Sequence, residues 1–252
     1  MISPGSQKMR QKPRFVWGGA LLAASLVTMP VKASVNKSIT IGDNMEASGG
    51  STVNGNITVG SRTTVTDTLS TVNGRIRVDD NSRLDDVETV NGSIRIGSGT
   101  IVGDVGSVNG SIRLGENVTV SGEIRIVNGE IEMEQGTTVA GDVSNINGGF
   151  QITAAEIGGN LSTVSGDVWL NEGSIIQGHL YVESPGGWSL FNKRKPRIVI
   201  GPGARVVGNI ELEREVELYI SESSEVGGVT GELRWEDAVR FSGDRPRSWA
   251  TE

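Results

Sequence analysis

Aliphatic residues recur every six positions along most of this chain, with Ser, Thr, Asp, Glu and Arg between them. Every third hexad carries Val-Asn-Gly or a close variant, at residues 53–55, 72–74, 90–92, 108–110, 127–129, 146–148 and 164–166. The motif thus repeats every 18 or 19 residues, and a fixed period of this kind is the signature of stacked repeats. The pattern predicts that three hexads form one coil.

Short extended strands account for the finer pattern. The valine of each motif and the aliphatic residues about six and twelve places later, as in Val72, Val78 and Leu84, are expected to point into a common core. Another apolar residue four places after the valine, such as Ile76, has the even spacing that returns an extended chain to the same side. Large rings are expected not to fit so narrow an interior, in line with an aromatic content of 4%.

The sequence therefore predicts an all-β fold, a parallel three-sided β-helix or solenoid of about nine to ten coils with 18–19 residues per coil. It is expected to span residues 34–233, with a loop insertion at 183–197 where Ser-Pro-Gly-Gly and a basic run interrupt the period. Residues 234–252 lose the period and are expected to form a polar C-terminal cap or tail containing Trp235, Phe241 and Trp249.

The asparagines of the motif are predicted to lie one above another at a corner of the coil. Their side-chain amides can then hydrogen-bond along the stack. Glycine and asparagine are also expected there because each corner needs residues that tolerate positive φ. This structural ladder comprises Asn54, Asn73, Asn91, Asn109, Asn128 and Asn147.

Residues 1–33 have the pattern of a secretory signal peptide. A basic start precedes an apolar stretch of about 17 residues, and Val-Lys-Ala at 31–33 is an acceptable cleavage site. Its removal leaves 18 basic residues against 30 acidic ones, a net charge of −12. We therefore expect an exported chain, periplasmic or extracellular, that does not bind nucleic acid. The alternative is an uncleaved segment that tethers the chain to a membrane.

Residues 200–210, Ile-Gly-Pro-Gly-Ala-Arg-Val-Val-Gly-Asn-Ile, resemble the coil motif of the bactofilins, and residues 139–143 and 157–161 fit the same type of motif. The Val-Asn-Gly-Ser-Ile-Arg coils are equally similar to a family of repetitive exported β-proteins described as adhesins. The two resemblances cover residues 39–231. They imply a three-sided β-helix that assembles end to end, and they supply no catalytic residue.

Composition narrows the chemistry. The absence of cysteine excludes disulfides, thiolate zinc sites and cysteine catalysis, and a single histidine excludes a multi-histidine metal site. No cofactor or metal site is expected. His179 is interpreted as a surface residue, although acyltransferases with hexapeptide repeats use a histidine. The acidic pairs at 79–80 and 85–86, with Glu116, Glu134 and Glu172, are interpreted as a solvated surface, although a polysaccharide-acting enzyme would need paired carboxylates.

One column of outward residues carries like charges. Arg77, Arg95 and Arg113 fall at the same place in successive coils, and stacked like charges repel one another. Arg113 is expected to pair with Glu132. Arg77 and Arg95 then need acids from neighbouring columns, such as Asp79 and Glu88, or an anionic ligand, because guanidinium groups match carboxylates and phosphates. A second possible contact is the basic stretch 193–197.

The function expected from these features is that of an exported, non-enzymatic structural, polymer-forming or adhesive protein of the cell envelope. The mechanism would be end-to-end self-association, since an unpaired strand edge at a coil end templates another molecule. With only residues 34–38 ahead of the repeat, the N-terminal end is expected to be bare. The alternatives are a monomeric binder of an anionic envelope polysaccharide through the arginine column, and a β-helical enzyme that acts on polysaccharide.

Overall fold

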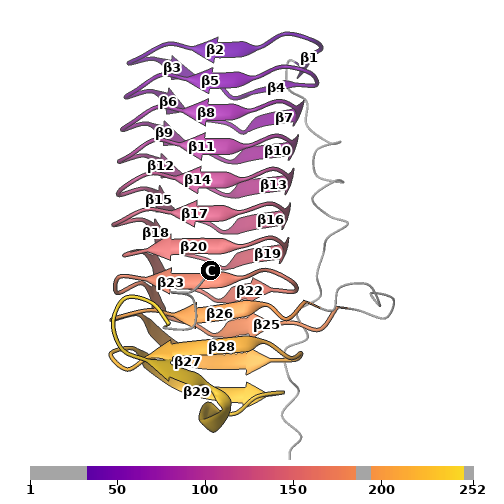
Figure 1. Ribbon diagram of the computed structural model, residues 1–252. Helices are drawn as coiled ribbons and strands as arrows, with labels where there is room; N and C mark the ends of the chain where they lie inside the picture. Colours follow the sequence, from indigo (N-terminus) through magenta and orange to yellow (C-terminus); the bar gives the residue numbers. More distant parts are fainter. Residues whose placement is uncertain (1–32, 186–193, 247–252) are drawn as a thin grey trace, which may run out of the picture.

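Short parallel strands stack coil upon coil on three faces in the computed structural model, which describes residues 33–185 and 194–246 (Figure 1). About ten coils follow one another, as the sequence predicts. Each strand pairs with the equivalent strand of the coils before and after it, in parallel and mostly without a shift of register. At a strand spacing of ~4.8 Å, ten coils make a rod of about 45 Å.

We name the three faces by what they carry. The asparagine face consists of β1 (Ala33–Ser34), β4 (Gly50–Thr52), β7 (Leu69–Asn73), β10 (Val87–Asn91), β13 (Val105–Asn109), β16 (Ile124–Asn128), β19 (Val143–Asn147), β22 (Leu161–Thr163) and β25 (Leu180–Val182). The arginine face consists of β2 (Ile39–Ile41), β5 (Ile57–Val59), β8 (Ile76–Val78), β11 (Ile94–Ile96), β14 (Ile112–Leu114), β17 (Ile131–Met133), β20 (Phe150–Thr153), β23 (Val168–Asn171), β26 (Arg197–Ile200), β28 (Glu217–Ser221) and β30 (Val239–Phe241).

The third face has two-residue strands. This short-strand face consists of β3 (Glu46–Ala47), β6 (Thr64–Val65), β9 (Arg83–Leu84), β12 (Ile101–Val102), β15 (Thr119–Val120), β18 (Thr138–Val139), β21 (Glu156–Ile157) and β24 (Ile175–Ile176). Two longer strands, β27 (Arg205–Leu212) and β29 (Glu225–Gly231), bend around a corner and continue both the short-strand and the asparagine face.

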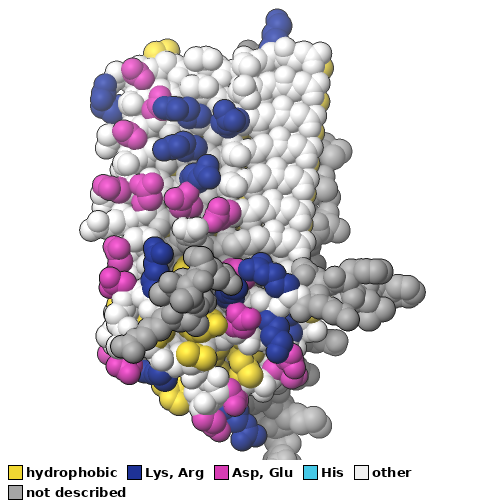
Figure 2. Space-filling model, viewed as in Figure 1, with side chains coloured by type: hydrophobic (Ala, Val, Ile, Leu, Met, Phe, Trp, Pro, Cys, Tyr) yellow, Lys and Arg dark blue, Asp and Glu magenta, His cyan; other side chains and the backbone are white. Residues whose placement is uncertain are grey.

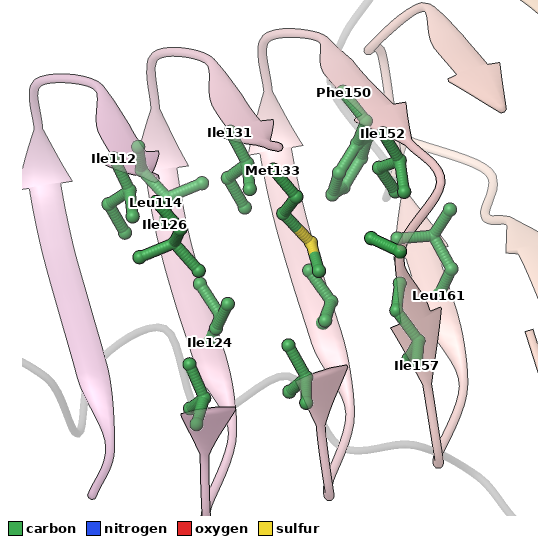
Figure 3. Close-up of a cluster of buried hydrophobic side chains, with 14 of the residues drawn as sticks. Ile112, Leu114, Ile124, Ile126, Ile131, Met133, Phe150, Ile152, Ile157 and Leu161 are labelled. Carbon is green, nitrogen blue, oxygen red and sulfur yellow. The ribbon is translucent and has the colours of Figure 1, made fainter. Parts of the chain in front are cut away.

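Branched aliphatic side chains fill the interior in columns that run along the rod (Figure 3). Ile112, for example, stacks between Ile94 and Ile131, and all three are fully buried. One ring does fit, against expectation. Phe150 is completely buried, and it stacks against Val168, which is smaller than the isoleucines of the other coils.

The motif valines, however, point outward, so their predicted place in the core is wrong. They are half-buried on the outer surface of the asparagine face, and none belongs to the core or packs against it. The alternation of side chains along a strand decides this, because Leu69 and Thr71 point inward and Val72 then points out. We call this outward column the valine stripe; it comprises Val53, Val72, Val90, Val108, Val127, Ile146 and Val164.

A polar residue takes the inward place beside most of these corners; Ile126 in β16 and Val182 in β25 are the exceptions. The buried hydroxyl of Thr71 donates to the carbonyl oxygen of Gly55 in the preceding coil at 2.9 Å. The Nδ2 of buried Asn145 donates to Gly129 in the same way at 2.8 Å. These bonds satisfy carbonyl groups that the turn would otherwise leave without partners inside the rod.

The asparagine corner uses positive φ only in part. None of the six ladder asparagines adopts it, but the motif glycines Gly110, Gly129 and Gly148 do, with φ of 143–155°. Positive φ also occurs after the arginine face, at Asn44, Arg62, Asn81 and Asn117, with values of 56–58°. The glycine of the motif is required by close approach. A Cβ on Gly92 would lie 1.9 Å from the carbonyl oxygen of Gly74.

The two ends of the rod differ. Among the described residues, β2 is the first strand of the arginine face and pairs with β5 alone. At the other end a 3₁₀ turn, η1 (Trp235–Asp237), lies against β29, and the chain then adds β30 to the stack, where Phe241 is buried. The stack therefore extends past residue 233, into the segment expected to be a cap or tail. Among the described residues, no helix has the length and apolar character needed to cross a membrane.

Candidate functional site

The three arginines singled out from the sequence lie directly above one another on the arginine face. Arg77, Arg95 and Arg113 come from the middle positions of β8, β11 and β14, and the next place in the column is Glu132. The middle residue of a three-residue strand points outward when its neighbours are buried. Figure 2 shows the resulting cluster of basic side chains in the upper half of this face, with acidic groups beside and below it.

Two of these arginines already have acidic partners. Arg77 Nε lies 2.9 Å from Asp79 Oδ1, and Arg113 Nε lies 2.7 Å from Glu132 Oε2, as the sequence predicted. Within the described residues, no carboxylate lies within ion-pair distance of Arg95. Glu88 is not its partner, because it lies on the asparagine face. Arg95 is therefore the guanidinium that a ligand can use.

A shallow hollow of about 340 Å³ opens over this column. The three arginines border it together with Asp79, Asp80 and two glutamates. Asp80 Oδ1 is engaged, since it accepts a hydrogen bond from the Ser98 amide at 2.9 Å. The hollow thus has mixed charge, with three arginines and four carboxylates. Arg95 is the arginine in it that has no ion pair among the described residues, and its guanidinium can bind one carboxylate, sulfate or phosphate group.

The ladder asparagines also lie in one column, each donating Nδ2 to the Oδ1 of the asparagine one coil earlier. The distances are 2.7–3.1 Å. The sequence interpretation missed the first member, Asn36, which accepts the bond from Asn54. The ladder ends at Asn147, because Ser165 holds the next place. Every amide in this column is used within the rod, so its role is structural.

A second ladder, not foreseen from the sequence, follows the corner between the short-strand and asparagine faces. Here a side chain accepts the backbone N–H of the next coil, as Asp86 Oδ1 does from Asp104 at 2.8 Å and Asp104 Oδ1 from Glu123 at 2.9 Å. Burial, more than neighbouring acids, raises the pKa of Asp86 and of Glu123. These carboxylates hold coils together at a corner away from the hollow.

His179 belongs to this second ladder. Its backbone N–H donates to Asn160 Oδ1 at 2.9 Å, and its Nδ1 accepts from the Asn209 N–H at 3.1 Å. The ring stacks on Tyr181 with 5.5 Å between ring centroids, and Nδ1 lies 3.3 Å from Glu211. The side chain is 38% exposed, so it is a surface residue that completes a backbone hydrogen bond.

The remaining sequence-based predictions fall partly outside the described residues. Residues 1–32 of the signal peptide, Trp249 and most of the loop insertion lie outside the described part. Ala33, the last residue of the predicted signal peptide, lies inside it. Arg194, in the basic stretch, lies in the described part and pairs with Asp167 at 2.5 Å. Over residues 33–185 and 194–246, no group of three acidic or histidine side chains has the arrangement needed to hold a metal ion.

Comparisons with protein-family models, with curated proteins and with solved structures give no match for this chain.

Proposed function

We propose that this protein is an exported, non-enzymatic rod of the cell envelope that assembles end to end through its N-terminal coil. The observation that supports this most directly is that no strand of the described residues pairs with the outer edge of the first coil. β2 pairs with β5 on one side only. Ile39 and Ile41 are partly exposed, whereas Ile57 and Val59 at the same places in the next coil are fully buried.

The unpaired edge has a defined polarity. The Ile39 amide donates to Asn56, and the Ile41 carbonyl accepts from Gly60, both in the second coil. Alternate residues of a strand turn their backbone groups to opposite sides, so Thr40 directs its N–H and C=O away from the rod. Met45, 53% exposed, adds apolar surface to this coil. Such an edge is a template for a strand of another molecule.

Thr40→Pro tests this assembly because it removes the outward N–H without removing a bond to the second coil. Residues 34–252 of the native sequence are expected to form end-to-end oligomers in sedimentation velocity and negative-stain microscopy. The proline variant should remain a single rod with an unchanged circular dichroism spectrum, and Thr40→Ala should still assemble. Monodisperse single rods of the native protein at all concentrations would contradict the proposal.

Arg95 supports a second candidate function, binding of an anionic polysaccharide along the arginine face. The free guanidinium and the hollow above it supply one anion site. Retention on an immobilised uronic-acid polymer should fall with added salt. It should be lost when Arg77, Arg95 and Arg113 are all changed to Ser, and Arg95→Ser alone should account for most of the loss. Arg83→Ser, on the short-strand face, is the matched control; equal retention of all variants would exclude this function.

A further inference from the structure

One outward column of the asparagine face is apolar along most of the rod. The valine stripe runs over seven consecutive coils, and every member is half-buried and faces outward. Beside it lies the asparagine ladder, where Figure 2 shows a broad area without charged side chains over the upper coils. A continuous column of partly exposed apolar side chains is a candidate interaction surface.

A second outward column on the same face contains two opposite charges. In coil order it reads Ser70, Glu88, Gly106, Arg125 and Ser144. Glu88 and Arg125 are therefore two coils apart, ~9.6 Å at the strand spacing, with a glycine between them. Arg125 has a side chain that is 55% exposed and pairs with Glu123 at one of its nitrogens.

Glu88 lacks a partner of its own. Its Oε2 is buried and, within the part of the chain that is described, accepts no hydrogen bond. Its charged neighbours are Asp86 and Asp104, which have the same sign. Burial and these two carboxylates raise the pKa of Glu88. A basic group from outside the rod can contact this carboxylate through Oε1, or through Oε2 once the side chain rotates.

The proposed centre lies on β13. Gly106 is the midpoint between Glu88 and Arg125, and Val108, two residues later on β13, has three residues of the valine stripe on either side. Val35, 62% exposed, takes the same place one coil before Val53, and Glu183 takes it one coil after Val164. A two-fold axis parallel to the strands and passing over β13 reverses the order of the coils and keeps each column opposite itself. Glu88 of each copy then faces Arg125 of the other, which gives two equivalent contacts. Val90 of each copy likewise faces Val127 of the other.

We propose that two copies of this chain pack through their asparagine faces as antiparallel rods, with valine stripe against valine stripe and Glu88 of each copy paired with Arg125 of the other. A self-complementary patch of this kind is what an isologous two-fold interface requires. Without residues 1–33 the chain has a net charge of −12, so two copies repel each other overall, and a face with few charged residues allows the closest approach. The apolar contact covers seven coils, because Glu183 takes the valine place in the coil beyond Val164.

Charge reversal tests the pairing. In the full exported chain, Glu88→Arg or Arg125→Glu places like charges at both symmetry-related contacts, so the dimer dissociation constant from sedimentation equilibrium should rise at least about tenfold. The double variant restores both pairs in exchanged order and should recover most of the affinity. Arg83→Glu, on the short-strand face, should have no effect. Two reversals that weaken the dimer without recovery in the double variant would overturn the pairing.

Cross-linking tests the symmetry independently of charge. The chain has no cysteine, and Val108 lies opposite itself across the proposed axis. Val108→Cys should therefore give covalent dimers with a short bis-maleimide, whereas Thr58→Cys, an equally half-buried outward place on the arginine face, should not. Equal yields from both variants, or none from Val108→Cys, would overturn the proposal. Thr40→Pro should leave this dimer intact, which separates it from end-to-end assembly.

Discussion

At the scale of single residues, the solenoid depends on side chains that bond to the coil next to their own. Asn109 donates to Asn91 at 2.9 Å and accepts from Asn128 at 2.9 Å. Gly92 has its place because a Cβ there would meet a carbonyl oxygen. In each Val-Asn-Gly motif the valine is thus an outward apolar side chain, the asparagine forms one rung of the ladder, and the glycine allows the backbones of two coils to approach closely.

Asn109→Ala removes two rungs of the ladder. Because the ladder is exposed and water can replace part of each bond, we expect a loss of about 1 kcal/mol in the free energy of unfolding. Asn147→Ala, at the end of the ladder, removes a single asparagine–asparagine bond of 3.1 Å and should cost about half as much. Urea unfolding of both variants measures the difference; equal losses would mean that the bonds along the stack contribute nothing.

Glu183 gives the chain a pH dependence. Burial and the carboxylate of Glu213 raise its pKa to about 7, so ionisation costs more in the folded chain than in the unfolded one. The contribution of the neutral Glu183 carboxyl to the free energy of unfolding is therefore fully present below its ordinary pKa of 4.5. This contribution is lost as the pH rises through 7. Since the side chain is half-exposed, Glu183→Gln should add only about 1 kcal/mol at pH 8 and nothing at pH 4. Urea titrations at both values check this, with exposed Glu116→Gln as the control.

At the scale of strands and corners, coils of 18 and 19 residues differ without disturbing the register. Two residues separate Leu84 from Val87 at the corner before the asparagine face, but three separate Val65 from Leu69. The strands on both sides keep their partners. The corner therefore absorbs the additional residue, and the strands do not.

A glycine inserted between Asp85 and Asp86 should accordingly be tolerated, because it lengthens the corner to that of its neighbour. We expect a loss below about 1 kcal/mol, since loop closure depends weakly on length. The same insertion between Glu88 and Thr89 turns the rest of β10 inside out and should prevent the coil from stacking. Thermal unfolding followed by circular dichroism compares the two, and equal damage would contradict this account.

Much of this element-level pattern could be predicted from the sequence because its period is regular. The three faces, the columns of Ile76 and Val78, and the asparagine ladder follow from spacing alone. The direction of Val72 could not be predicted, because the six-residue period crosses a corner where strand alternation does not hold. The pairing of Arg77 with Asp79 was predictable from neighbouring columns. The burial of Glu88 was not, because it depends on how Gly106 and the corner residues Asp86 and Asp104 lie around it in the folded chain.

At the scale of the whole molecule, each coil contacts mainly the coils before and after it. Stability is then close to a sum of coil and interface terms. Deletion of residues 93–110 removes one 18-residue unit and joins two coils whose columns still match. We expect a folded rod that is shorter by ~4.8 Å, with a melting temperature within a few degrees of the native one.

The same deletion removes Gly106 and places Glu88 next to Arg125 within one chain, so the proposed antiparallel dimer should weaken. Small-angle scattering measures the length of the rod and sedimentation measures the dimer. A chain that fails to fold would show that the coils are not equivalent units. A dimer of unchanged affinity would contradict the assignment of its centre to β13.

The stacked coils also set the response of this molecule to mechanical load. Each coil of the regular repeat up to residue 182 stores 18 or 19 residues within a rise of ~4.8 Å, so such a coil pulled loose from one end releases about 60 Å of extended chain. Tension applied along the axis opens the hydrogen bonds of one coil at a time, including its rungs in the two side-chain ladders. Over these coils the protein would therefore lengthen under force in nearly equal steps and dissipate energy as each coil opens.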